Sequence, residues 1–172
     1  MKVLETERLI LRRMSTGDAD FILGLLNEPS FLRFIGDRGV RTLEDARAYI
    51  LKGPVDMYER LGFGLYITEL KGEGVPIGMC GLIKRDFLED VDIGFALLPG
   101  FWGQGYAREA AAAVMEHATG ALGLKRLVAI TNPDNQSSIG LLEKLGFRFD
   151  RMIRTKADGE ELRFFIWDSE RP

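Results

Sequence analysis

The first third of the chain changes from the hydrophobic period of a strand to that of helices. Residues 4–14 alternate imperfectly between hydrophobic and polar side chains, which predicts one opening strand. Asp18 stands where a helix N-cap is expected, and the hydrophobic positions within 21–26 share one helical face. We therefore predict a helix that ends near Asn27, followed by a shorter helix that restarts at Pro29.

A third helical segment starts at Thr42, because Asp45 follows it at the spacing of a capping box. This helix is predicted to reach Leu61 unless Gly53 and Pro54 interrupt it. The period then changes, and alternation with turn-like connections predicts three strands, at residues 63–70, 76–84 and 91–98.

The second half of the chain combines helices with strands. We predict a long helix at about 104–121, a strand at 124–130, a helix at about 137–145, and a hairpin of 148–156 and 161–168 around a turn at 157–159. The strand–helix–strand order implies a right-handed parallel crossover. The whole pattern predicts a mixed α/β fold with one dominant sheet, in a single domain that spans residues 1–172.

Composition and charge narrow the class of protein. The chain has 172 residues, of which 46% are hydrophobic and 28% charged, as in an ordinary globular domain. A net charge of −3 argues against a broad nucleic-acid surface. The single cysteine, Cys80, leaves no disulfide framework or thiolate metal cluster, and we expect no metal. Without a bilayer-length apolar run or a secretory leader, we expect a soluble protein of the cytoplasm and no membrane partner.

The segment with the clearest chemistry joins the strand at 91–98 to the long helix. A strand that ends before Pro99 is followed by a glycine-rich turn at 100–105 and an alanine-rich helix. The N-terminus of a helix carries unpaired N–H groups and a partial positive charge, and glycine lets the backbone approach a ligand closely. This arrangement suits a phosphate or pyrophosphate. The local pattern fits an ordinary strand-to-helix turn equally well.

Two common phosphate motifs are absent from this turn. The P-loop requires Lys followed by Ser or Thr after its second glycine, and neither pair is present. The dinucleotide fingerprint has Gly at its first two positions and a small residue at its third. Gly103 and Gly105 match the first two positions, but Arg108 occupies the third. A nicotinamide enzyme is therefore disfavoured.

Three segments together resemble the GNAT acetyltransferases, and in particular the branch around the Rim-type ribosomal-protein N-terminal acetyltransferases. They are ETERLILRRM with the following Asp18, IGFALLPGFWGQGYAREA, and NPDNQSSIGLLEKLGF, in the family's order and over nearly the whole chain. One departure is Trp102, which stands where the wider superfamily has Gln or Arg. That substitution is typical of the branch, but it removes a cationic phosphate contact at this position.

The resemblance implies a mostly antiparallel sheet, flanked by helices and splayed at one parallel strand pair, with acetyl-coenzyme A in the gap. In this site the loop N–H groups would bind the pyrophosphate, Asn135 the pantetheine arm, and Ser138 would face the sulfur. The implied coenzyme A residues are Ala96, Leu97, Leu98, Trp102, Gly103, Gln104, Gly105, Tyr106, Ala107, Arg108, Asn135 and Ser138. The residues alone leave simpler interpretations open, with Arg108 as a solvated cation and either Asn135 or Ser137 as a helix N-cap.

The reaction itself indicates which further groups are needed. Aminolysis of a thioester requires a neutral amine, a hydrogen-bond donor for the oxyanion, and a thiolate that can leave. Asp92 is the best candidate for the base, and its alternative interpretation is an exposed strand residue. A backbone N–H near Leu97 or Leu98 is the expected oxyanion donor, and the Ser138 hydroxyl could stabilise the sulfur. His117 lies too far along its helix to serve as the base.

The acceptor follows from protonation. An α-amine with a pKa near 8 is about one-tenth neutral at pH 7, whereas a lysine near 10.4 is neutral only about once in a few thousand. A site this poor in bases therefore favours a peptide or protein N-terminus. A small amine such as a polyamine or aminoglycoside is an alternative acceptor, and a non-catalytic coenzyme A-binding module is an alternative function. A homodimer is also compatible with the sequence. Acceptor contacts are expected from 31–41, 87–90 and the C-terminal hairpin.

Overall fold

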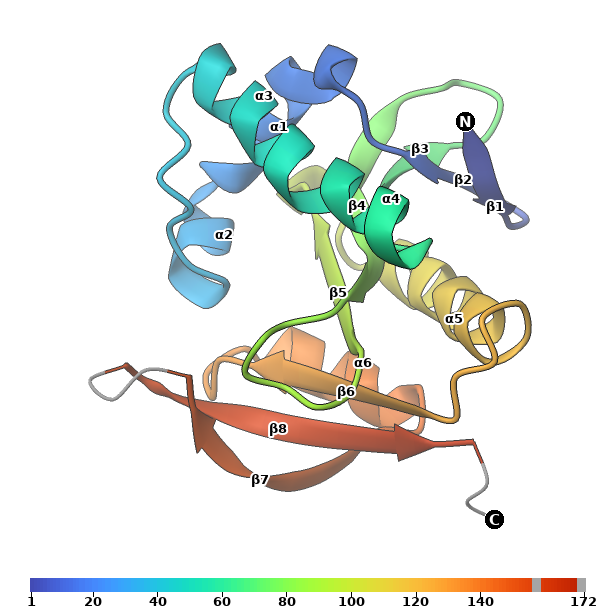
Figure 1. The fold of residues 1–172 in the computed structure, drawn as a ribbon, viewed down its shortest axis with the longest axis vertical. Coiled ribbons are helices and arrows are strands. Elements are labelled where there is room, and N and C mark those ends of the chain that lie inside the picture. Colours follow the sequence, from blue (N-terminus) through green and yellow to red (C-terminus); the bar gives the residue numbers. More distant parts are fainter. Residues whose placement is uncertain (156–158, 170–172) are drawn as a thin grey trace.

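The computed structural model describes residues 1–155 and 159–169, and a single twisted sheet dominates them (Figure 1). Its strands are β1 (Lys2–Glu5), β2 (Leu9–Arg13), β3 (Leu65–Leu70), β4 (Pro76–Ile83), β5 (Asp92–Leu97), β6 (Arg126–Thr131), β7 (Arg148–Arg154) and β8 (Glu161–Asp168). They lie in the order β1-β2-β3-β4-β5-β6-β8-β7, and all neighbours are antiparallel except β5 and β6. The mixed fold with one parallel pair is thus confirmed.

Six α-helices flank the described part of the sheet: α1 (Ala19–Leu26), α2 (Pro29–Phe34), α3 (Leu43–Ile50), α4 (Asp56–Leu61), α5 (Tyr106–Thr119) and α6 (Gln136–Lys144). The first four gather at one end of the sheet, α5 packs along β4 and β5, and α6 lies beside β6 (Figure 1). Hydrophobic residues from the N-terminal strands, the central strands, α5 and β8 join in one main core. This core fixes α5 against the strand from which its preceding loop emerges.

The opening segment differs from its prediction, because it forms two antiparallel strands rather than one. The chain reverses between β1 and β2, where the Thr6 N–H donates to the Leu9 carbonyl at 2.9 Å. The Leu9 N–H in turn donates to the Thr6 hydroxyl at 3.0 Å. This local bonding satisfies backbone groups at the reversal.

The helix predicted from Thr42 to Leu61 forms with a local change of winding. The capping box is present, since the Asp45 N–H donates to the Thr42 hydroxyl at 3.0 Å. Around Pro54 the chain adopts a π-helical stretch, Leu51–Val55, before α4 continues to Leu61. Proline lacks an N–H, so the wider turn accommodates it without ending the helix.

The parallel pair opens into a gap. β5 and β6 are in register only at Asp92 and Val128, where the Val128 N–H donates to the Val91 carbonyl at 2.9 Å. On the other side of β5 the Leu98 N–H donates to Ile77 of β4 at 2.8 Å. Because successive residues of a strand direct their backbone groups to alternate edges, Leu97 faces the gap.

The C-terminal hairpin is also confirmed. β7 and β8 pair antiparallel from Arg148 opposite Ile166 to Arg154 opposite Glu161. Most of its predicted turn at 157–159 lies outside the described residues.

Candidate active site

The glycine-rich loop has the geometry of an anion site. Gly103 and Gly105 adopt positive φ angles of 73° and 83°, which favour glycine. Gly105 is the N-cap of α5, and its carbonyl accepts the first helical bond from the Glu109 N–H at 3.0 Å. The N–H groups of Tyr106, Ala107 and Arg108 in this first turn are consequently free of helical partners.

A cavity of about 770 Å³ lies between this loop and α6. Its lining includes Ala96, Leu97, Trp102, Gly103, Gly105, Tyr106, Ala107, Arg108, Asn135 and Ser138. The Arg108 side chain is exposed and forms no hydrogen bond or ion pair with the described residues. The structure therefore brings together ten of the predicted coenzyme A residues around one cleft. The other two, Leu98 and Gln104, are next to lining residues in the sequence but are not part of the lining.

Trp102 has a structural role in the splayed gap. Its indole Nε1–H donates to the Leu97 carbonyl at 2.9 Å, while the residue as a whole is 51% exposed. The Leu97 N–H faces the same gap, whereas the Leu98 N–H is already used within the sheet. Of the two predicted oxyanion donors, Leu97 therefore has the suitable orientation.

Asn135 begins α6 and resolves the question of its N-cap. Its side-chain Oδ1 accepts from the Ser138 N–H at 3.2 Å, so Asn135 rather than Ser137 caps the helix. The Asn135 amide nitrogen and the Ser138 hydroxyl have no hydrogen-bond partner within the described ranges. Both groups are thus free to bind a ligand at the gap.

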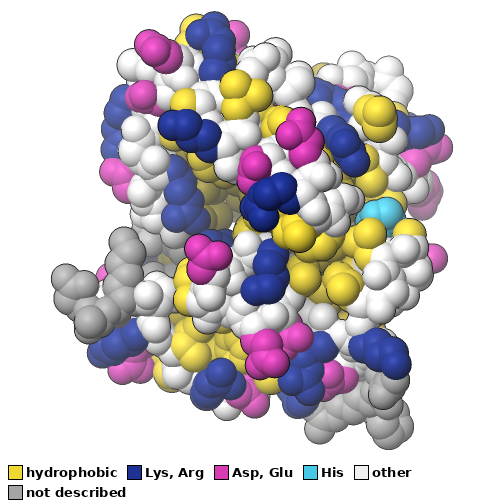
Figure 2. Space-filling view, in the orientation of Figure 1, with side chains coloured by type: hydrophobic (Ala, Val, Ile, Leu, Met, Phe, Trp, Pro, Cys, Tyr) yellow, Lys and Arg dark blue, Asp and Glu magenta, His cyan; other side chains and the backbone are white. Residues whose placement is uncertain are grey.

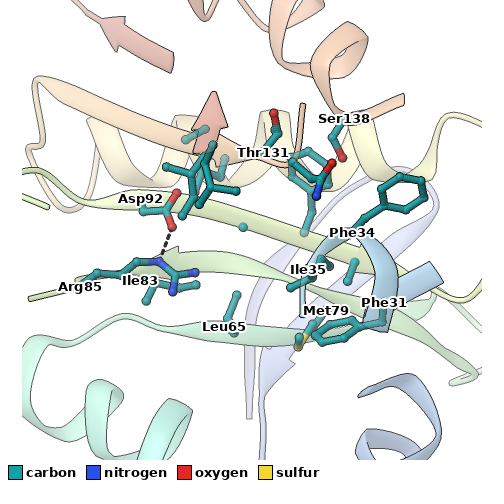
Figure 3. Close-up of a pocket in the computed structure, with 18 of the residues that line it drawn as sticks. Phe31, Phe34, Ile35, Leu65, Met79, Ile83, Arg85, Asp92, Thr131 and Ser138 are labelled. Carbon is teal, nitrogen blue, oxygen red and sulfur yellow. Dashed lines mark hydrogen bonds and ion pairs between the residues drawn. The ribbon is translucent and has the colours of Figure 1, made fainter. Parts of the chain in front are cut away.

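A second cavity, of about 460 Å³, lies over β4 and β5 on the side of α2 and α3. Its floor includes Asp92, Gly94 and Ala96, which share one face of β5 because side chains alternate along a strand. Aromatic and aliphatic side chains from α2 stand opposite (Figure 3). Seven residues line both cavities: Phe31, Phe34, Ile35, Phe95, Ala96, Asn135 and Ser138. The two cavities therefore meet where β5 and β6 separate.

Glycine at position 94 of β5 lets neighbouring side chains pack at the floor of this second cavity. A Cβ atom at Gly94 would stand 3.3 Å from the Ile83 side chain and 3.6 Å from the Leu65 side chain, and both of these residues line the cavity. The floor between Asp92 and Ala96 is consequently hydrophobic.

Asp92 is a buried carboxylate at the closed end of the gap. The residue is 1% exposed, so its alternative interpretation as an exposed strand residue is wrong. Oδ2 accepts from the Arg85 Nε at 2.8 Å, and Oδ1 has no partner in the described structure (Figure 3). Burial raises the pKa of Asp92 to about 6, although the Arg85 guanidinium opposes this effect. The carboxylate is therefore mainly ionised at pH 7 to 8.

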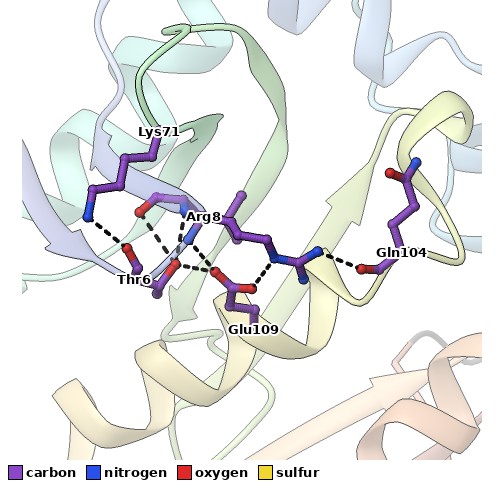
Figure 4. Close-up of polar contacts among 6 residues, drawn as sticks. Thr6, Arg8, Lys71, Gln104 and Glu109 are labelled. Atoms are coloured by element: carbon purple, nitrogen blue, oxygen red, sulfur yellow. Dashed lines mark hydrogen bonds and ion pairs between the residues drawn. The ribbon is translucent and has the colours of Figure 1, made fainter.

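A polar network behind the glycine-rich loop was not predicted. Arg8, just before β2, donates from Nε to Glu109 at 2.7 Å and from a terminal nitrogen to the Gln104 carbonyl at 3.0 Å (Figure 4). Its guanidinium also lies 4.3 Å from the centre of the Tyr106 ring. Burial acts against ionisation of Glu109, but hydrogen bonds from Thr6 and Arg8 lower the pKa of its carboxyl. We call Thr6, Arg8 and Glu109 the loop clamp.

Other reactive side chains lie away from the two cavities. Cys80 is fully buried, and burial raises the pKa of its thiol to about 12, so it is a core residue. His117 is in the last turn of α5 and lines neither cavity. Across the described ranges, no three His, Cys, Asp or Glu side chains form a group that could hold a metal ion. The described helices are all too short or too polar to cross a membrane.

Known proteins resemble this chain over most of its length. The family model "Acetyltransferase (GNAT) domain" matches residues 8–148. The uncharacterized N-acetyltransferase YoaA of Bacillus subtilis is 30% identical over 154 residues, covering 88% of this chain and 86% of that protein. YnaD, an uncharacterized N-acetyltransferase of the same organism, is 28% identical, covering 84% of this chain and 82% of that protein.

Solved structures share the fold. An acetyltransferase from Agrobacterium tumefaciens superimposes with a TM-score of 0.81 at 26% identity, covering 97% of this chain and 94% of the other. A ribosomal-protein-S5-alanine acetyltransferase from Vibrio fischeri gives 0.80 at 19% identity, covering 98% of each chain. RimL, a ribosomal L7/L12 acetyltransferase in complex with coenzyme A, gives 0.76 at 16% identity, again covering 98% of each chain.

Proposed function

The chain belongs to the GNAT acetyltransferases, and from this membership we propose that it acetylates the α-amine of a peptide or protein N-terminus. N-acetyltransferases of this family use acetyl-coenzyme A, and the chain has the fold of this family. The observation that carries the choice of acceptor is Asp92, a buried carboxylate that lines the cavity next to the coenzyme cleft and whose Oδ1 has no partner in the described structure. We also propose that residues 1–172 act as one domain, since the main core joins residues from β2 to β8.

The groups that line the cleft suit the chemistry of acetyl-coenzyme A. Free N–H groups at the start of α5 and the unpartnered Arg108 guanidinium suit its phosphates. The backbone of Leu97 at the unpaired edge of β5, and the Asn135 amide across the gap, suit the amide groups of its pantetheine arm. When bound, acetyl-coenzyme A supplies the acetyl group that is transferred.

Asp92 is assigned the role of base through Oδ1, which would accept the proton that the amine loses. With an Asp92 pKa of about 6, taking a proton from an α-ammonium near 8 costs about 3 kcal/mol, whereas a lysine near 10.4 costs about 6 kcal/mol. The difference favours an α-amine. Arg85 holds the carboxylate through Oδ2 and leaves Oδ1 available.

Two further groups would act on the acyl side. The Leu97 N–H, which faces the gap, is assigned as donor to the carbonyl oxygen, where negative charge develops. The Ser138 hydroxyl, which is free of partners and lines both cavities, would donate to the sulfur as it leaves. A thiol with a pKa near 8.5 requires little such help, so we expect Ser138 to contribute less than Asp92.

A matched pair of peptides tests the choice of acceptor. One peptide has a blocked N-terminus and a free lysine, and the other has a free N-terminus and an acetylated lysine. We expect coenzyme A release with the free N-terminus to exceed that with the lysine by about a hundredfold near pH 7.5, in line with the neutral fractions of the two amines. Faster release with the lysine peptide, or with spermidine, would contradict the proposal. Cofactor binding without any amine-dependent release would instead indicate a non-catalytic module.

A further inference from the structure

The second cavity, of about 460 Å³, is where the proposal places the acceptor amine, and we call it the acceptor cavity. It has an excess of positive charge, although the chain as a whole carries −3. Three charged residues line its described part, namely Arg38, Arg85 and Asp92. Arg85 pairs with Asp92 through one nitrogen, so this pair is neutral and the Arg38 cation remains. In the space-filling view, Lys and Arg side chains, with some Asp and Glu side chains, border a hollow with hydrophobic side chains inside (Figure 2).

Arg38 lies in the connection between α2 and α3, at the mouth of the cavity. Its side chain is exposed and forms no hydrogen bond or ion pair with any described residue. Arg38 lines the cavity together with Arg85 and Tyr49. Arg38 and Asp92 therefore border the same space.

The carboxylate next to Arg38 in the chain is engaged elsewhere, because Asp37 forms an ion pair with Arg41 at 2.5 Å. Asn132, which also lines the cavity, donates to the Glu160 carboxylate at 3.3 Å. An amine that brought additional positive charge would thus meet a cation at the mouth of the cavity.

We propose that the preferred acceptor is an acidic N-terminus, with a carboxylate at its second residue that Arg38 binds. This inference rests on the proposed function, because it assumes that the α-amine reaches Asp92. One or two extended residues span about 3 to 7 Å, which is the scale of a cavity of 460 Å³. Polyamines lack the anionic group and are disfavoured.

Three peptides that differ only at the second residue, with Asp, Asn or Lys, test this specificity. At low salt we expect kcat/KM for the Asp peptide to exceed that for the Asn peptide by about fivefold, as for an exposed ion pair. The preference should fall as salt rises. Arg38→Gln should bring the ratio close to one, and Arg38→Glu should shift the preference toward the Lys peptide. Arg47→Gln removes the same charge from α3 outside both cavities and should leave the ratio intact.

The possible failures are distinguishable. Equal rates for the three peptides, or a wild-type preference for the Lys peptide, would overturn the acidic specificity while leaving N-terminal acetylation in place. A preference for the Asp peptide that persists in Arg38→Glu would overturn the role of Arg38, because another residue would then bind the carboxylate. No acetylation of any of the three peptides would overturn the proposed function together with this inference.

Discussion

At the scale of single residues, Asp92 shows how a candidate functional group can oppose stability. Burial raises the pKa of its carboxyl from 3.8 to about 6. Between these values the unfolded chain releases a proton that the folded protein retains, so Asp92 lowers the free energy of unfolding as pH rises from about 4 to 6. A carboxylate that was only structural would more usually have a lowered pKa and the opposite effect.

Asp92→Asn should therefore separate stability from activity. The amide oxygen can still accept from Arg85, but the cost of ionisation disappears. In urea denaturation at pH 7.5 we expect the free energy of unfolding of the variant to exceed that of the parent by up to about 3 kcal/mol. Near pH 4 the two free energies of unfolding should be about equal. Its kcat should fall by about tenfold to a hundredfold, as for loss of a modest general base. If the variant were less stable at pH 7.5, the ion pair with Arg85 would be mainly structural.

At the scale of elements, the loop clamp connects the start of the chain to the helix that presents the glycine-rich loop. Arg8 is 96 residues from Gln104 and 101 from Glu109 in sequence, yet it contacts both. The clamp residues line neither cavity, so we expect them to affect a ligand in the cleft only through the position of the loop. Preorganised donors bind an anion without the cost of ordering the loop.

Glu109→Gln should consequently raise the KM for acetyl-coenzyme A by about three- to tenfold, the size expected for a partly exposed ion pair with hydrogen bonds. We expect little change in kcat or in the KM for the peptide. Glu116→Gln, at an exposed position of the same helix, is the matched control and should leave all three constants as they are. Steady-state kinetics with each substrate varied in turn measures the effect. An equal rise in both KM values would point to general disorder rather than to the loop.

What the sequence could predict at this scale depends on how local the signal is. The three central strands, the capping box at Thr42 and the loop before α5 follow from short-range periodicity and turn chemistry, and the structure confirms them. The opening reversal near Thr6 was missed because its hydrophobic alternation runs through the turn. The clamp and the burial of Asp92 depend on contacts between distant segments, which no local pattern reports.

At the scale of the whole molecule, the splayed sheet joins two halves that share few backbone bonds. β5 and β6 are in register at one pair of residues, and the larger cavity lies beyond the end of β5, between the glycine-rich loop and α6. The charge around the acceptor cavity also depends on the fold, because an acidic chain encloses a cavity whose charged lining residues are mostly cations. A ligand that fills the gap would bind both halves at once and stabilise only the folded state.

Acetyl-coenzyme A should therefore raise the melting temperature of the protein. At a concentration one hundred times its Kd, a ligand that binds only the folded state contributes about 2.7 kcal/mol. For a chain of 172 residues this corresponds to a shift of about 5 to 10 °C. Gly105→Val serves as the comparison, because a β-branched side chain disfavours the φ of 83° and its Cβ would stand 3.3 Å from the Arg8 guanidinium, which would disturb the turn that presents the helix N-terminus. We expect this variant to remain folded by circular dichroism but to show no shift. A wild-type melting temperature that is unchanged at saturating cofactor would contradict the assignment of the cleft. A full shift in folded Gly105→Val would place the phosphates elsewhere.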